Sequence, residues 1–120
     1  MSKDYREITR SISATLAEFR TAQPEVMKGF NQLAGASLRE GALSAKTKEL
    51  IALSVGIAGH CDACIGFHVR ALVRLGVTRA ELEEALGVCV YMGGGPSLMY
   101  AADALAAYEQ FAVRTEPVPA

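Results

Sequence analysis

Several features are missing from this chain of 120 residues, and each absence excludes a class of protein. There is no tryptophan, and no segment approaches the roughly 18 consecutive apolar residues that a membrane-spanning helix needs. The first residues also contain no uninterrupted apolar stretch of the kind found in secretory signal peptides. We therefore expect a soluble cytoplasmic protein without a membrane partner.

An excess of charge of one sign is missing too. Twelve Lys and Arg residues oppose 13 Asp and Glu residues, which gives a net charge of -1, and the basic residues form no cluster. Proteins that bind nucleic acid usually have a basic patch or stripe that contacts phosphates. The sequence therefore predicts no nucleic-acid partner. With 51% hydrophobic and 21% charged residues, the composition is that of a folded globular protein.

Apolar residues recur three or four positions apart along most of the chain, which predicts helices and no strands. The expected helices cover residues of about 4–21, Pro24 up to Gly41, Ala45 to about Ala58, Cys61–Asp62 to Leu75, Thr78 to the glycines at 93–95, and Ser97 to about Phe111. The fold class expected from this pattern is all-α, a compact bundle of about six helices.

Local signals mark several helix ends. Ser44 can cap a helix start, Thr78 and Glu81 form a capping-box pattern, and Gly76 suits the left-handed residue after a helix. The glycines at 93–95 precede a proline, follow a helix rather than a strand, and lack the lysine of a phosphate-binding loop. They predict a tight turn between helices.

Two of the expected helices, Lys46–Ala58 and Thr78–Met92, have few charges around their circumference. Such helices in a small protein need burial on more than one side, which predicts a homo-oligomer. The first expected helix instead has a charged face opposite one apolar stripe, which consists of Ile8, Ile12, Leu16 and Phe19.

The most informative stretch runs from Gly59 to His68 with the sequence GHCDACIGFH. Cysteines three apart, such as Cys61 and Cys64, lie on one face of a helix, and the partial positive charge of a helix N-terminus favours a thiolate. His68 lies one turn beyond Cys64, where it can serve its sulfur as a base or as a charged partner. This stretch therefore permits dithiol redox chemistry.

Glu49 joins this set if the helices on either side of Gly59 and His60 fold back antiparallel. It then faces about residue 70 and can approach His68. A buried carboxylate would orient the imidazole and raise its basicity. The sequence thus predicts a relay that contains Glu49, His68, Cys64 and Cys61.

Other interpretations of these residues stay open. The cysteines could sense redox state or bind metal in a helical module that is not an enzyme. A zinc site needs about four ligands. Cys61, Cys64 and His68 would then require a fourth ligand from His60, Cys89 or Glu49.

Three further residues near or outside the motif have expected places. His60 lies at the bend and is expected at the surface, and Cys89 lies in an apolar helix and is expected in the core. Asp62 adds a negative charge beside both sulfurs and opposes thiolate formation in part.

The order Glu49, eleven residues, Cys61-x-x-Cys64, three residues, His68 resembles the signature of the alkylhydroperoxidase D-like branch of the carboxymuconolactone decarboxylase superfamily. The similarity extends from about Leu43 to Phe111. It implies a single domain of this type over residues 1–114, with its core at 43–111. It also implies an all-α homo-oligomer, a trimer or hexamer. The last residues, 115–120, contain two prolines and no periodicity, and predict a flexible tail.

The resemblance further implies a cofactor-free peroxidase for hydrogen peroxide or organic hydroperoxides, with no metal and with a dedicated dithiol or disulfide-reductase electron donor. Cys64 would be the peroxidatic cysteine, which the peroxide oxidises to a sulfenic acid. Cys61 would first supply a proton and would then react with the sulfenic acid to form a disulfide. His68 and Glu49 would form the proton relay. Helix physics alone names Cys61 as the more acidic thiol, but only Cys64 adjoins His68.

One departure from the family bears on activity. The better-studied peroxidases have a further histidine between the cysteines, whereas Asp62 and Ala63 fill that gap here. The alternative within the superfamily is a decarboxylase-like lyase that acts on a small lactone or carboxylate. Such a lyase needs no redox-active dithiol, so the two cysteines argue against it.

Overall fold

The computed structural model describes residues 3–113, and the regular structure in that range is entirely α-helical. The helices are α1 (Tyr5–Ala22), α2 (Pro24–Leu38), α3 (Ala45–Ala58), α4 (Asp62–Arg74), α5 (Arg79–Gly93) and α6 (Gly95–Ala112). The predicted all-α fold of six helices is confirmed, whereas the predicted tail at 115–120 lies outside the described residues. Within 3–113 the structure contains no helix with both the length and the apolar character of a membrane span.

The predicted capping groups set most helix boundaries. The side chain of Ser44 accepts a hydrogen bond at the start of α3, and Thr78 and Glu81 form a complete capping box at the start of α5. Gly76 has a φ of 78°, the left-handed conformation expected after α4. Only Gly94, with a φ of 71°, separates α5 from α6, so the predicted turn is a single residue.

The second helix ends earlier than predicted. It stops at Leu38 rather than at Gly41, because Arg39 adopts extended backbone angles (φ -69°, ψ 153°). The Nζ atom of Lys48 in α3 donates a hydrogen bond of 2.7 Å to the carbonyl of Arg39. This carbonyl therefore has a partner outside the helix, and the chain turns toward α3.

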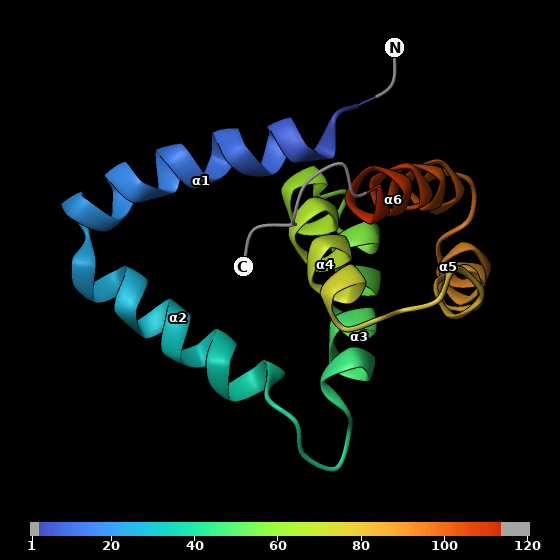
Figure 1. The fold of residues 1–120 in the computed structure, drawn as a ribbon, viewed down its shortest axis with the longest axis horizontal. Coiled ribbons are helices and arrows are strands. Elements are labelled where there is room, and N and C mark those ends of the chain that lie inside the picture. Colours follow the sequence, from blue (N-terminus) through green and yellow to red (C-terminus); the bar gives the residue numbers. More distant parts are fainter. Residues whose placement is uncertain (1–2, 114–120) are drawn as a thin grey trace.

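Helices α3 to α6 form the body of the molecule, and α1 and α2 extend from it along two sides of a triangle that α3 closes (Figure 1). Only the first turns of α1 pack against α4 and α6. The buried apolar core consists of Tyr5, Leu53, Ile57, Ile65, Val69, Leu72, Val77, Leu82, Leu86, Ala101, Ala104, Ala107 and Phe111.

The apolar stripe predicted for the first helix is buried only at its start. Ile8 packs against the core, whereas Ile12, Leu16 and Phe19 are 39%, 37% and 45% exposed. Helix α2 contains no buried residue at all. The reason is that α1 leaves the body after its first turns (Figure 1), so the described part of the chain has nothing to cover these side chains.

Gly66 sets how closely α1 crosses α4. A Cβ atom added at Gly66 would lie 2.7 Å from Cγ2 of Thr9, closer than real Cβ atoms approach. We expect Gly66→Ala to lower the free energy of unfolding by about 1–3 kcal/mol through overpacking, measured by urea denaturation. Thr9→Ser in the same chain removes the clashing methyl but keeps the hydroxyl that donates to the Tyr5 carbonyl, and should restore most of this loss.

Gly87→Ala is the matched control for this prediction. Gly87 is exposed within α5, and an added Cβ there would have no neighbour within 4 Å. Its replacement should leave stability unchanged or raise it by up to about 1 kcal/mol, because alanine favours helix over glycine. Equal stability of the Gly66→Ala and Gly87→Ala chains would contradict the close crossing.

Candidate active site

The two cysteines of the motif lie at the start of α4 and form a disulfide. Their Cα atoms are 5.2 Å apart, and both residues are half-buried. Cys61 is also the N-cap of α4, since its Sγ accepts a hydrogen bond of 3.1 Å from the backbone N–H of Cys64. When the pair is reduced, its sulfurs lie at the positive end of the helix dipole, which favours a thiolate.

Helix α3 approaches the disulfide closely because of a glycine. His60 makes the bend between α3 and α4 with a φ of 55°, and the N–H of Cys61 donates 2.9 Å to the carbonyl of Gly56. A Cβ atom added at Gly56 would lie 3.0 Å from Cβ of Cys64. Gly56 is not among the residues predicted for the site, although an isolated glycine inside an apolar helix is a usable signal of close packing.

Glu49 of α3 and His68 of α4 are in direct contact, with 2.6 Å between Oε1 and Nδ1. Glu49 is 8% exposed, and a buried carboxylate needs a partner, which His68 provides. The two helices thus fold back antiparallel, and the predicted approach of Glu49 to His68 is confirmed. Because Nδ1 faces Glu49, the other ring nitrogen, Nε2, is left for a different partner.

The four predicted residues therefore belong to one helical hairpin, but not all of them are bonded to one another. Glu49 contacts His68, and Cys61 is joined to Cys64. Within residues 3–113 no hydrogen bond connects His68 to either sulfur. In the disulfide form neither sulfur has a proton to donate, so the Cys64–His68 bond expected from their spacing has no thiol donor.

His60 is exposed, as predicted, and its ring has a defined neighbour. It stacks on Tyr100 of α6, with ring centroids 4.8 Å apart and planes inclined by 3°. His60 is one of the residues that could have supplied a fourth metal ligand. Among the residues that the structure describes, no group of three or more His, Cys, Asp or Glu side chains is placed to hold a metal ion.

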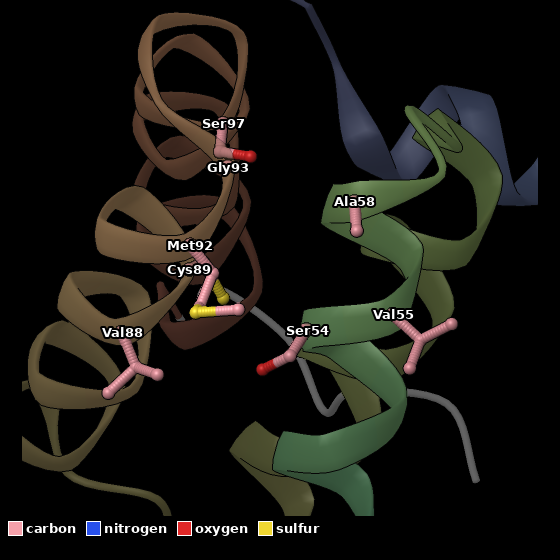
Figure 2. Close-up of a pocket in the computed structure, with 8 residues that line it drawn as sticks. All are labelled: Ser54, Val55, Ala58, Val88, Cys89, Met92, Gly93 and Ser97. Atoms are coloured by element: carbon pink, nitrogen blue, oxygen red, sulfur yellow. The ribbon is translucent and has the colours of Figure 1, made fainter.

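The expectation that Cys89 belongs to the core is corrected by the structure. Cys89 is a half-buried free cysteine that packs at the edge of the core. It lines an apolar cavity of about 300 Å³ between α3 and α5 (Figure 2). Val88 and Met92 beside it are 63% and 76% exposed, since this side of α5 is uncovered in the described part of the chain. The four predicted site residues do not line this cavity.

Asp62, between the two cysteines, is held by residues that were not predicted to belong to the site. Its Oδ1 accepts hydrogen bonds from Nζ of Lys3 at 2.9 Å and from the hydroxyl of Tyr5 at 3.0 Å. Lys3 also donates to Oδ2 of Asp103 at 2.8 Å. Lys3 and Tyr5 are 59 and 57 residues away from Asp62 in sequence, so no spacing pattern could have found them.

The capping role of Cys61 can be tested without any reaction. Serine is a strong N-cap and alanine is a weak one, so under reducing conditions the Cys61→Ser chain should be more stable than Cys61→Ala by about 1 kcal/mol. Urea denaturation of both chains measures this difference. Ser44→Ala removes the N-cap of α3, and the stability that it loses is the reference for the loss of a helix cap in this protein. Equal stability of the two Cys61 variants would show that position 61 does not cap α4 once the disulfide is absent.

Comparison with known proteins gives consistent matches. The model of the carboxymuconolactone decarboxylase family matches residues 24–107. The crystal structure of an apo carboxymuconolactone decarboxylase family protein from Legionella pneumophila is 55% identical, with a TM-score of 0.89, and the match covers 91% of this chain and 97% of that one. An uncharacterized protein from Cupriavidus necator is 36% identical over 109 residues, covering 91% of this chain and 96% of its own.

A second solved structure is more distant. It is a carboxymuconolactone decarboxylase family protein from Thermotoga maritima described as "possibly involved in antioxidative response". It is 29% identical with a TM-score of 0.76, and the match covers 85% of this chain and 87% of that one. The matched family region, 24–107, includes all four residues of the candidate site. The chain belongs to the carboxymuconolactone decarboxylase family.

Proposed function

We propose that this protein is a dithiol peroxidase that reduces hydrogen peroxide or organic hydroperoxides through Cys64 and Cys61. The observation that supports this best is that one hairpin contains both a cysteine pair able to form a disulfide and a buried carboxylate–imidazole pair, Glu49 and His68. The description of the Thermotoga maritima relative agrees with such an activity.

The reaction would start with the thiolate of Cys64. Its sulfur attacks one peroxide oxygen, the O–O bond breaks, and the products are a Cys64 sulfenic acid and an alcohol, or water from hydrogen peroxide. The thiol of Cys61 then attacks the sulfenic sulfur, and water leaves as the disulfide forms. The peroxide has gained two electrons, which the two thiols have lost.

His68 and Glu49 would move the protons in this cycle. The spare Nε2 of His68 takes the proton of the Cys64 thiol, one turn away on α4, and returns it to the departing oxygen. The imidazolium that forms in between is stabilised by the carboxylate of Glu49, 2.6 Å from Nδ1. This placement favours Cys64 over Cys61 as the attacking residue, because Cys61 lies before the first residue of α4.

A reductant must return the disulfide to two thiols. A dithiol or a disulfide-reductase protein would supply the two electrons by thiol–disulfide exchange, attacking a half-buried sulfur at the start of α4. The cytoplasmic location expected from the sequence fits this requirement, because that compartment keeps thiols reduced.

Thiol titration before and after one equivalent of cumene hydroperoxide tests the proposal. The reduced protein should lose two thiols, and mass spectrometry should locate a bond between Cys61 and Cys64. Cys64→Ser should abolish the reaction, and His68→Ala and Glu49→Gln should slow it about 100-fold or more, the usual contribution of a general acid–base group. Cys89→Ser is the matched control and should react at the original rate.

Unchanged thiols in the original chain would refute the peroxidase proposal. A decarboxylase-like lyase would then be the next candidate, since Glu49 and His68 could still transfer a proton to a small lactone or carboxylate. A helical module that only senses redox state would form the same disulfide, but slowly, and its rate of peroxide consumption with dithiothreitol would not fall in the His68→Ala and Glu49→Gln chains.

We also propose that copies of this chain assemble, as a trimer or hexamer, through the surfaces that the single chain leaves uncovered. Val26, Phe30 and Leu33 of α2 are 55%, 63% and 65% exposed, and an isolated helix of 15 residues is marginal in water without packing. The apolar side of α5 around Val88 and Met92 is exposed as well. A second copy of the chain has apolar surfaces to match both.

Sedimentation velocity measures this assembly. The original chain should sediment as an oligomer, and a double variant with Phe30→Glu and Leu33→Glu should dissociate to monomers, because charges on an apolar interface are costly to bury. Gln32→Glu adds a charge to an exposed position on the same helix and should leave the oligomer intact. A monomer in the original chain would contradict the proposal.

A further inference from the structure

The carboxylate of Asp62 presents an electrostatic problem for a dithiol. Asp62 is the first residue of α4 and lies between Cys61 and Cys64 in sequence. A negative charge near a thiol disfavours the thiolate, which is the reactive form of cysteine. Without a partner, the carboxylate of Asp62 would therefore counteract the effect of the helix dipole, which favours the thiolate form of the cysteines.

Two donors from the start of the chain meet this carboxylate at a single oxygen. The ammonium of Lys3 and the hydroxyl of Tyr5 both donate to Oδ1 of Asp62, at 2.9 and 3.0 Å. Tyr5 is fully buried, and burial together with its hydrogen bond to Asp62 raises the pKa of its hydroxyl, so it remains a donor. The hydrogen bonds to Asp103 and Asp62 raise the pKa of the Lys3 ammonium, so it remains charged.

Helix α6 fixes this donor segment in place. Gln110 accepts a hydrogen bond of 2.7 Å from the backbone N–H of Tyr5, and its side-chain amide donates 2.8 Å to the carbonyl of Lys3. Asp103 binds the ammonium of Lys3, which lies 5.0 Å from the ring centroid of Tyr100. The start of α1 therefore lies against α6 and the first turn of α4 (Figure 1).

We propose that Lys3 and Tyr5 are positioning residues that partly offset the negative charge of Asp62, Lys3 by its own charge and Tyr5 by a hydrogen bond, and so make the cysteine pair more acidic than its own motif allows. The benefit of more acidic thiols rests on the proposed function. The acidity itself does not, because it can be measured in the absence of peroxide. The other titratable groups around Asp62 are Asp103, which shares Lys3, and Tyr100, with His60 stacked on its ring.

The test measures the pH dependence of iodoacetamide alkylation of the reduced protein, in a Cys89→Ser chain so that only the paired thiols react. Mass spectrometry assigns each alkylated cysteine. Lys3→Met should raise the pKa of the more acidic thiol by about 0.5–1, because Asp62 then keeps its full charge. Tyr5→Phe keeps the buried ring and removes only the hydroxyl, so it should raise the thiol pKa by less than Lys3→Met does.

Two controls show whether the effect runs through Asp62. Lys46→Met removes the ion pair between Nζ of Lys46 and Oε2 of Glu81, which are 2.9 Å apart at the start of α5. This pair is about as exposed as that of Lys3 and Asp62, and its loss should leave the thiol pKa unchanged. Asp62→Asn should lower the thiol pKa, and in that chain Lys3→Met should have less than about a quarter of its original effect.

Two results would overturn the inference. One is an unchanged thiol pKa in both the Lys3→Met and the Tyr5→Phe chains. The other is a Lys3→Met shift of full size in the Asp62→Asn chain, which would show that the ammonium acts on the sulfurs directly or through Asp103 rather than through Asp62. Neither depends on turnover, so a protein that alkylates as expected but fails to reduce peroxide would refute the proposed function and leave this inference standing.

Discussion

The close approach of α3 to the start of α4 is the constraint on which the site depends. Gly56 has no side chain, so Cys64 can pack directly against the backbone of α3. The same antiparallel register places Glu49, about two turns before Gly56 on α3, beside His68, about one turn after Cys64 on α4. A larger residue at position 56 would separate the helices and would disturb the cysteine pair and the carboxylate–imidazole pair together.

The site is completed by parts of the chain that are remote in sequence. The start of α1 and the second half of α6 meet around Asp62 through Lys3, Tyr5 and Gln110. Tyr5 serves two purposes there, because its ring is buried in the core and its hydroxyl reaches the charged residue of the motif. Packing of the core and the hydrogen bonding of the motif's carboxylate are therefore linked through one side chain.

Local signals in the sequence predicted most of the fold. Helix periodicity and the caps at Ser44 and Thr78 depend on neighbours within a few residues, and the structure has them as expected. The contact between Glu49 and His68 was also predicted, on the assumption that the helices on either side of the short bend fold back antiparallel. Long-range features did not follow: the donors to Asp62 come from the chain start, and no periodicity shows where α1 leaves the body.

The exposure of apolar side chains was the least predictable property, because it too depends on contacts that are distant in sequence. An apolar stripe shows that a helix has one face to bury, but it does not say against what. In α1 the residues Ile12, Leu16 and Phe19 keep that pattern while lying at the surface of the single chain. Cys89 was misplaced for the same reason, since its helix is apolar on a side that the rest of the described chain does not cover.

The burial of Glu49 has a consequence for how this family member can change over evolutionary time. Its carboxylate is 8% exposed, and His68 is the partner that compensates for its lost hydration. A mutation that removes the imidazole leaves a buried carboxylate unpaired, at a cost of about 1–3 kcal/mol in folding. A chain that loses His68 must therefore also replace Glu49 or lose stability, so the two positions are expected to be lost together rather than one at a time.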